Sequence, residues 1–165
     1  MSIAPDDTFP IPSRVREGSV WVDRTGRREL TGRTASGVEI PIGQGEGRVT
    51  PGELLKLALI GCAGMSSDFT ISRRLGEDFP MRIYAHGVSD EHTNRYETID
   101  EQIQLDLSEV SEDEAEQLRR LIRSAIGVGC TVERTLAEPP EIGHQIDHAP
   151  ASRRLATAAD EAPQA

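Results

Sequence analysis

Cys62 and Cys130 carry the side chains best suited to chemistry in this sequence, and they are its only cysteines. They lie 68 residues apart, which fits neither a disulfide-stabilised scaffold nor a zinc site. Two thiols of this kind are either small buried apolar side chains or a redox pair. The small residues around Cys62 favour inert packing. Cys130 follows Gly129 at an expected helix start, where free amides and the helix dipole lower a thiol pKa.

Charged residues supply further candidates for a thiol site. Glu53 is explained by a capping box with Thr50, in which each side chain bonds a free backbone amide. Arg24 and Arg27 fall in an expected hairpin turn, and Arg33 falls on an expected strand. An arginine brought over a buried thiol stabilises the thiolate, because the guanidinium stays charged when desolvated. Otherwise these arginines are solvated surface charges.

The remaining motifs argue against a metal or another cofactor. His144 and His148 are four residues apart, a spacing that suits metal binding on a helix. They follow two consecutive prolines, however, in a stretch that we expect to be extended. Residues 44–47 lack the Gly-Lys-Ser/Thr ending of a phosphate-binding loop. We therefore expect no metal and no other cofactor.

A long helix over residues 50–75 must position Cys62. Thr50 is a good N-cap, Pro51 suits the first helical position, and Gly76 suits the C-terminal end. The first half is apolar on all sides, which is typical of a buried helix. The apolar run is shorter than the roughly 20 residues of a membrane span and contains Lys56, so we expect no membrane insertion.

The other elements predict an α+β fold. Alternating apolar residues indicate three strands in a meander and then two more strands after the long helix. Ser111 and Glu114 form a capping box that opens a second amphipathic helix, which should end at residues 127–129. A short helix should follow Cys130, with a weak last strand behind it. The expected strands are 19–23, 28–34, 38–42, 81–89, 95–107 and 141–148, and the expected helices are 50–75, 111–126 and 131–136.

Composition indicates one acidic domain. The chain has 165 residues, a net charge of −10 and a pI near 4.9, which argues against nucleic acid or an anionic membrane as partner. We expect the domain at residues 18–148, between disordered tails at 1–17 and 149–165. The N-terminus does not resemble a signal peptide, which favours the cytoplasm. One thin sheet cannot cover so apolar a helix, so we expect a homodimer.

Two segments resemble the motifs of the OsmC/Ohr family. TPGELLKLALIGCAGM (50–65) resembles that family's helix motif of Asn/Ser/Thr-Pro, Glu-Leu-Leu, an apolar run and a small residue before Cys. CTVERTL (130–136) resembles its second motif, Cys-Pro-Val-Ser. The resemblance covers about residues 18–146, including the Arg-x-Gly-Arg turn and the spacing of the cysteines.

The resemblance implies an intertwined homodimeric α+β fold and a thiol peroxidase that reduces organic hydroperoxides with a lipoyl-type dithiol. By position, Cys62 matches the peroxidatic cysteine, Cys130 the resolving cysteine and Arg24 the thiolate-stabilising arginine. Glu53 stands where many branches keep a glutamate. The hydroperoxide-resistance branch instead places its glutamate at the position of Gly52, so this chain resembles the OsmC-like branches more closely.

Two open points follow from these departures. Because Gly52 replaces the glutamate that pairs with the arginine, a second function stays open. In this alternative the protein is a non-catalytic dimer that binds a small lipophilic ligand. Thr131 replaces the proline that usually follows the second cysteine, and we expect little effect on the chemistry from that change.

Overall fold

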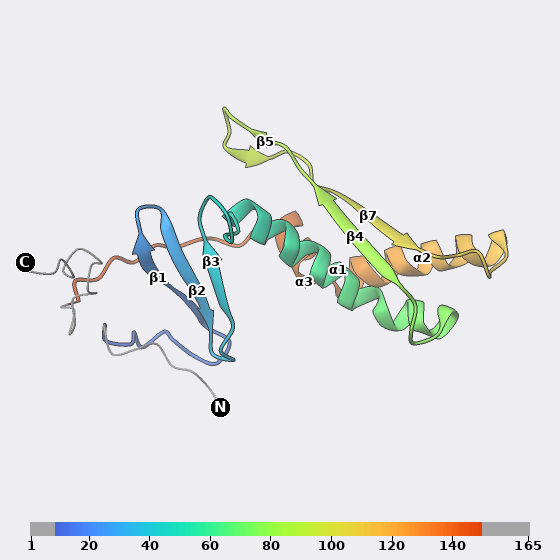
Figure 1. The fold of residues 1–165 in the computed structure, drawn as a ribbon, viewed down its shortest axis with the longest axis horizontal. Coiled ribbons are helices and arrows are strands. Elements are labelled where there is room, and N and C mark those ends of the chain that lie inside the picture. Colours follow the sequence, from blue (N-terminus) through green and yellow to red (C-terminus); the bar gives the residue numbers. More distant parts are fainter. Residues whose placement is uncertain (1–8, 150–165) are drawn as a thin grey trace, which may run out of the picture. The chain divides into compact units, whose positions relative to one another are not determined.

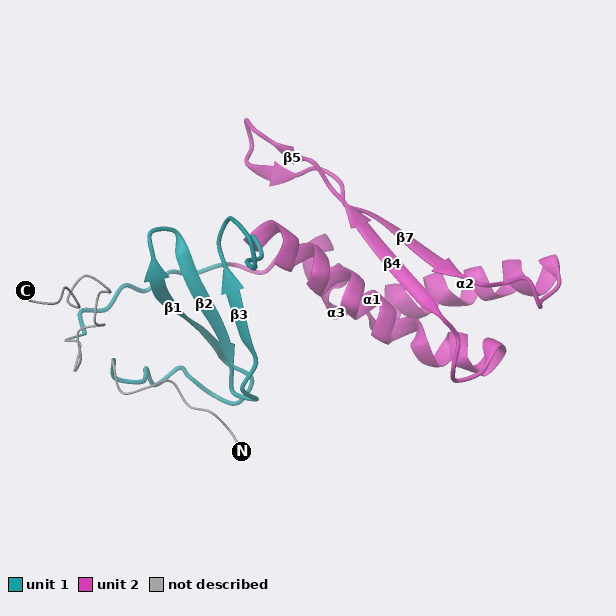
Figure 2. Cartoon of the chain, viewed as in Figure 1, with its two compact units in different colours: residues 1–50, 142–165 teal, residues 51–141 magenta. Residues whose placement is uncertain are grey.

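The computed structural model describes residues 9–149, and the chain divides into two compact units (Figure 2). One comprises residues 1–50 and 142–165, and the other comprises residues 51–141. The predicted disordered tails fall largely on residues 1–8 and 150–165, which lie outside the described residues.

The first unit contains an antiparallel three-stranded meander in the order β1–β2–β3, as predicted (Figure 1). Its strands are β1 (Val20–Gly26), β2 (Glu29–Thr34) and β3 (Glu39–Ile42). The predicted turn at residues 24–27 is wrong, because β1 continues past Arg24, which pairs with Leu30. A register shift between Arg24 and Gly26 moves the turn to Arg27 and Arg28, and Arg28 adopts a left-handed φ of 59°.

The second unit is built around α1 (Pro51–Leu75), whose 25 residues confirm the predicted long helix. Within the described residues, α1 is the only helix with the length and composition to cross a membrane. The argument that its apolar run is too short for a membrane span is therefore wrong. Core helices of soluble proteins share both properties. Here α1 packs against two helices, α2 (Glu112–Gly129) and α3 (Thr131–Ala137), and against the strand β4 (Met81–His86).

Two hairpins follow α1 in the chain. β4 pairs with β7 (Asp100–Leu105), and a short outer hairpin joins β5 (Ser89–Asp90) to β6 (Arg95–Tyr96). The predicted single strand over residues 95–107 is therefore wrong, because residues 97–99 separate β6 from β7. The inward face of the β4–β7 hairpin and the apolar stripe of α2 meet α1 in a core centred on Ile71, Leu118 and Ile122.

The ends of the helices decide where the second cysteine lies. The predicted capping box at Ser111 and Glu114 is confirmed. The helix ends within the predicted break at residues 127–129, but later than the expected last residue, 126, because α2 continues through Gly129 and the Cys130 amide still donates to the Ile126 carbonyl. Glycine propensity is a weak prior that tertiary contacts override. The short helix after Cys130 is confirmed, whereas residues 141–149 form no strand.

Candidate functional site

One face of α1 carries the candidate site. Gly52, Leu55, Leu59, Cys62 and Ser66 follow one another at intervals of three and four residues, which places them in one stripe along the helix. We call this set of residues the site stripe.

The structure brings Cys62 and Cys130 together, although they lie 68 residues apart in the chain. Cys62 is half-buried in the middle of α1, and Cys130 is fully buried as the N-cap of α3. The Cys130 thiol hydrogen-bonds to the Cys62 sulfur. Both cysteines are free thiols.

The first turn of α3 lowers the pKa of the Cys62 thiol. The main cause is the backbone N–H of Val132, which donates to the Cys62 sulfur and outweighs the opposing effect of burial. The Cys130 thiol, the Thr131 amide and the Ser66 hydroxyl add smaller contributions in the same direction. These donors stabilise a sulfur anion more than a neutral thiol. Cys62 is therefore the nucleophilic member of the pair.

The pKa of Cys130 moves in the opposite direction. Burial raises it, and the neighbouring Cys62 raises it further. The Glu133 amide, which donates to the Cys130 sulfur over 3.4 Å, opposes this rise without cancelling it. The expectation that the helix start lowers the pKa of Cys130 is therefore wrong. The pair consists of an activated Cys62 and a protonated Cys130.

Gly129 permits the close approach of the two cysteines. A Cβ atom at this position would lie 3.2 Å from both the Cβ and the Oγ of Ser66, so a larger residue would press against α1. At Gly127, two residues earlier, an added Cβ would meet no atom within 4 Å. The sequence shows a pair of glycines, but only the fold shows that Gly129 is the one in contact.

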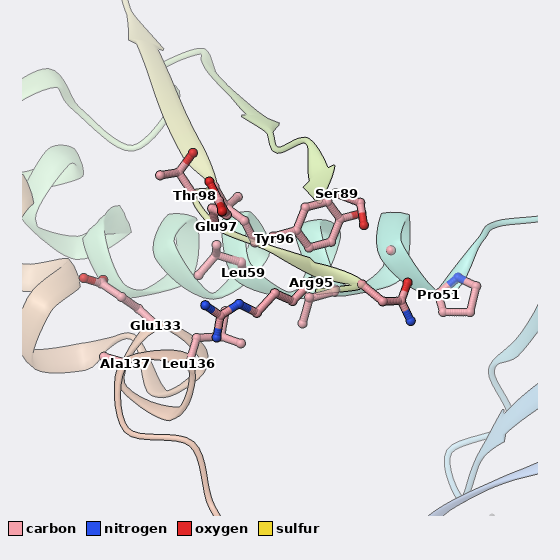
Figure 3. A pocket seen from close by; sticks show the side chains of 14 residues that line it. Pro51, Leu59, Ser89, Arg95, Tyr96, Glu97, Thr98, Glu133, Leu136 and Ala137 are labelled. Carbon is pink, nitrogen blue, oxygen red and sulfur yellow. The ribbon is translucent and has the colours of Figure 1, made fainter. Parts of the chain in front are cut away.

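A pocket of about 810 Å³ lies along the first half of α1, and Figure 3 shows the residues that line it. Leu55 and Leu59 of the site stripe form one wall, and Leu136 and Ala137 of α3 contribute another apolar surface. The β5–β6 hairpin and the segment after it supply a polar rim that includes Arg95 and Glu97. Leu59 lies three residues before Cys62, and the rim residue Glu133 lies three residues after Cys130. The pocket thus ends one helical turn from each thiol.

Tyr96 occupies the space beside Gly52. A Cβ at position 52 would lie 3.5 Å from the Tyr96 Cζ and would collide with the hydroxyl oxygen. Lys56, one helical turn further along α1, places its Nζ 5.5 Å from the centroid of the Tyr96 ring. This chain therefore has a tyrosine from β6 near the position where the hydroperoxide-resistance branch carries its glutamate.

The three candidate arginines all belong to the other compact unit, so the pairing of Arg24 with Cys62 stays a prediction. Arg33 forms ion pairs with Asp23, at 3.0 Å, and with Glu39. Arg27 lies in the turn between β1 and β2. In the second unit, Glu53 lies in the first turn of α1, and its capping and catalytic roles also remain predictions.

Sequence reasoning missed the donors of α3, the Ser66 contact and Tyr96. Thr131 was expected to matter little, yet its backbone N–H is one of the donors to Cys62, and proline has no such donor. In the described part of the chain, no three His, Cys, Asp or Glu side chains cluster in a way that suits a metal ion.

Comparison with known proteins identifies the family. The family model for OsmC-like protein matches residues 43–145. An uncharacterised protein of Mycobacterium tuberculosis is 44% identical over 129 residues, which cover 77% of this chain and 94% of the relative. The chain therefore belongs to the OsmC-like protein family.

Solved structures show the same fold. A hypothetical protein from Aquifex aeolicus matches with a TM-score of 0.59 and 21% identity, over 73% of this chain and 87% of that one. A putative osmotic stress induced and detoxification response protein from Psychrobacter arcticus matches with a TM-score of 0.58 and 16% identity, over 75% and 91% of the two chains. The predicted mixed α+β class and the OsmC-like architecture are thereby confirmed.

Proposed function

We propose that this protein is a thiol-dependent peroxidase that reduces organic hydroperoxides. The observation that carries the proposal is the asymmetry of the thiol pair. Cys62 has a lowered pKa and hydrogen-bonds to Cys130, whose pKa is raised. A peroxidase needs these two states, because a thiolate attacks the peroxide and a second thiol must then resolve the product.

The first step oxidises Cys62. Its thiolate attacks one oxygen of the hydroperoxide O–O bond, so that an S–O bond forms as the O–O bond breaks. The other oxygen leaves as an alkoxide and takes a proton from solvent to become an alcohol. Cys62 becomes a sulfenic acid, and the hydroperoxide is reduced by two electrons.

The second step forms a disulfide between the cysteines. The Cys130 sulfur attacks the sulfenic sulfur of Cys62, and water leaves with the Cys130 proton. An external dithiol of the lipoyl type then reduces the disulfide by thiol–disulfide exchange and becomes a cyclic disulfide itself. Both cysteines return as thiols, and no metal or organic cofactor takes part.

Within this proposal Arg24 stabilises the Cys62 thiolate and Glu53 helps to orient that arginine. Both roles rest on the match to the family motifs. The apolar walls of the adjacent pocket favour an alkyl hydroperoxide over hydrogen peroxide. The protein would act in oxidative-stress defence in the cytoplasm, where thiols stay reduced.

We propose in addition that the protein works as a homodimer. The described residues leave apolar side chains of α1 uncovered, with Met65 84% and Phe69 70% exposed. Patches of this kind mark interaction surfaces. Sedimentation at several protein concentrations should show a dimer, and a strictly monomeric chain would contradict this part of the proposal.

The test is peroxide consumption in the presence of dihydrolipoamide by the wild type, Cys62→Ser and Cys130→Ser. The wild type should turn over an alkyl hydroperoxide, and Cys62→Ser should lose all turnover. Cys130→Ser should consume one equivalent of peroxide per chain and then stop or slow markedly, with a trappable sulfenic acid at Cys62. No turnover by the wild type, or full activity in Cys62→Ser, would refute the peroxidase.

A second candidate is a non-catalytic dimer that binds a small lipophilic ligand, and the pocket beside Leu55 and Leu59 favours it. Treatment with one equivalent of peroxide followed by mass spectrometry separates the two functions. A chain lighter by two hydrogens, with Cys62 linked to Cys130, supports the peroxidase. Two unchanged thiols support the ligand-binding protein.

A further inference from the structure

Tyr96 is the side chain by which the β5–β6 hairpin reaches α1. It is half-buried, whereas its neighbours Arg95 and Glu97 are exposed. In Figure 3 its ring points from the hairpin toward the first turn of α1, where Pro51 is labelled. Gly52 and Lys56, which are four residues apart on α1, both contact this ring or its hydroxyl.

Two glycines from different elements make room for this one tyrosine. At Gly52 an added Cβ would collide with the Tyr96 hydroxyl. At Gly87, just after β4, an added Cβ would lie 3.1 Å from the Tyr96 Cδ1. The ring is therefore confined from both sides, and Lys56 adds a cation–π contact at 5.5 Å from its centroid. Such a side chain has a fixed position and can act as a wall.

The position of this wall relative to Cys62 follows from the geometry of α1. Gly52 precedes Cys62 by ten residues on the site stripe, which corresponds to about 15 Å along the helix axis. Leu55 and Leu59 line the pocket in between. Tyr96 lines the same pocket at the Gly52 end. An apolar tail that leaves Cys62 along these leucines would meet the Tyr96 ring.

We propose that Tyr96 is a specificity-determining residue, which closes the pocket at the start of α1 and limits the length of the hydroperoxide tail. The inference rests on the proposed peroxidase function and extends it to the choice of substrate. The peroxide group lies at Cys62, the tail packs on Leu55 and Leu59, and the Tyr96 ring stops it about 15 Å away. Gly52 serves the same purpose, because any side chain there would displace the ring.

The first experiment measures kcat/KM for linear alkyl hydroperoxides from four to twelve carbons. Tyr96→Ala should raise the ratio of kcat/KM for the longest substrate to kcat/KM for the shortest by about tenfold. The reason is that extra buried methylenes stabilise the transition state of the long substrate. Tyr84→Ala is the matched control, since Tyr84 is the only other tyrosine and is 48% exposed on β4. An unchanged ratio in Tyr96→Ala, or an equal change in both variants, would overturn the inference.

The second experiment tests the wall without peroxide chemistry. Cys62 is alkylated with N-alkylmaleimides of increasing tail length, and the labelled peptide is quantified by mass spectrometry. Tyr96→Ala should accelerate labelling by the long reagent relative to the short one, and Tyr84→Ala should not. If this shift is seen but the protein turns over no peroxide, the peroxidase function is refuted and the role of Tyr96 in limiting tail length is supported. If the protein turns over peroxide normally but labelling shows no shift, the role of Tyr96 is refuted and the peroxidase function is supported.

The third experiment uses the contact between Gly52 and the Tyr96 hydroxyl. Gly52→Ala should displace the ring and raise the long-to-short ratio in both assays, as Tyr96→Ala does. Tyr96→Phe removes the hydroxyl that the new methyl would meet, so Gly52→Ala combined with Tyr96→Phe should return the ratio to within about twofold of the wild type. Alanine favours the helix over glycine, so folding should be preserved. Simple additivity of the two changes would contradict the proposed contact.

Discussion

The surroundings of Cys62 and Cys130 act on the two thiols in opposite ways. Cys130 has the position usually associated with a reactive thiol, at the N-cap of a helix with the Glu133 amide bonded to its sulfur. Cys62 lies in the middle of α1, where the backbone amides bond within the helix. Yet the pKa of Cys62 is lowered and that of Cys130 is raised.

A helix N-terminus can therefore activate a thiol on another element. The amides of Val132 and Thr131 at the start of α3 donate to Cys62. Burial raises the pKa of Cys130 by more than the amides of Glu133 and Val132 lower it. A half-buried thiol that is surrounded by donors loses its proton more readily, and a fully buried thiol loses it less readily.

The largest expected effect is a difference in alkylation rate between the two cysteines. At pH 7.5 iodoacetamide should label Cys62 at least about a hundredfold faster than Cys130, because both thiolate fraction and access favour Cys62. The rate at Cys62 should reach half its maximum at a lower pH than for an ordinary cysteine, because its pKa is lowered. Peptide mass spectrometry over a pH series measures both quantities. Equal alkylation rates at Cys62 and Cys130 would contradict the conclusion that their surroundings activate only Cys62.

A larger residue at position 129 should reduce the difference in pKa between Cys62 and Cys130. In Gly129→Val the new side chain meets Ser66 and pushes the start of α3 away from Cys62. We expect the pKa of Cys62 to rise toward its ordinary value and the free energy of unfolding to fall by about 1–3 kcal/mol. Alkylation against pH and thermal unfolding measure the two effects.

Gly127→Val is the matched control for this change, because an added Cβ at Gly127 meets open space. It introduces the same residue into the same helix and should leave the pKa of Cys62 as it is in the wild type. If both variants changed that pKa alike, the contact between Gly129 and Ser66 would not be what positions α3.

A smaller effect is expected from replacing Thr131 with proline. Thr131→Pro removes one amide that donates to Cys62, and the Val132 amide, which has the larger influence, remains. The pKa of Cys62 should rise by less than in Gly129→Val, and stability should change little, because proline suits the first position of a helix. Thr131→Ala keeps the amide and should match the wild type. A pKa that is the same in all three proteins would exclude this donor.

The smallest expected effect concerns Glu101 on β7. Its Oε1 is buried without a hydrogen-bond partner among the described residues, and burial, followed by the charge of Glu133, raises its pKa above 4.5. A raised carboxyl pKa means that the charged form destabilises the fold above the folded-state pKa and that this cost disappears as the pH falls toward 4.5.

Glu101→Gln should therefore raise the free energy of unfolding at pH 7 by about 1 kcal/mol or less, and this gain should vanish near pH 4. Urea unfolding at both values of pH measures the gain, with Glu91→Gln in the exposed β5–β6 turn as the control that should change nothing. A gain of equal size at both values would mean that ionisation of Glu101 is not its cause.

Much of the local structure could be predicted from the sequence. The helix from Pro51, the capping box at Ser111 and the short helix after Cys130 depend on neighbouring residues, and all are confirmed. The errors occurred where an element ends, because a turn or a glycine can be accommodated at several neighbouring positions. Helix α2 continues through Gly129 against glycine propensity, and β1 continues past Arg24 at a shift in register with β2.

The α+β class, the resemblance to the OsmC/Ohr family and the two cysteines on which the proposal rests could all be predicted from the sequence. These conclusions follow from motifs and from periodicity, which short stretches of chain contain completely. The family resemblance already pointed to Cys62 as the reactive thiol, but the structure was needed to show which groups lower its pKa, that Gly129 contacts Ser66 of α1, and that Tyr96 lies against Gly52. Each of these joins residues more than 40 positions apart, and a pKa or a steric contact depends on which groups are neighbours in space.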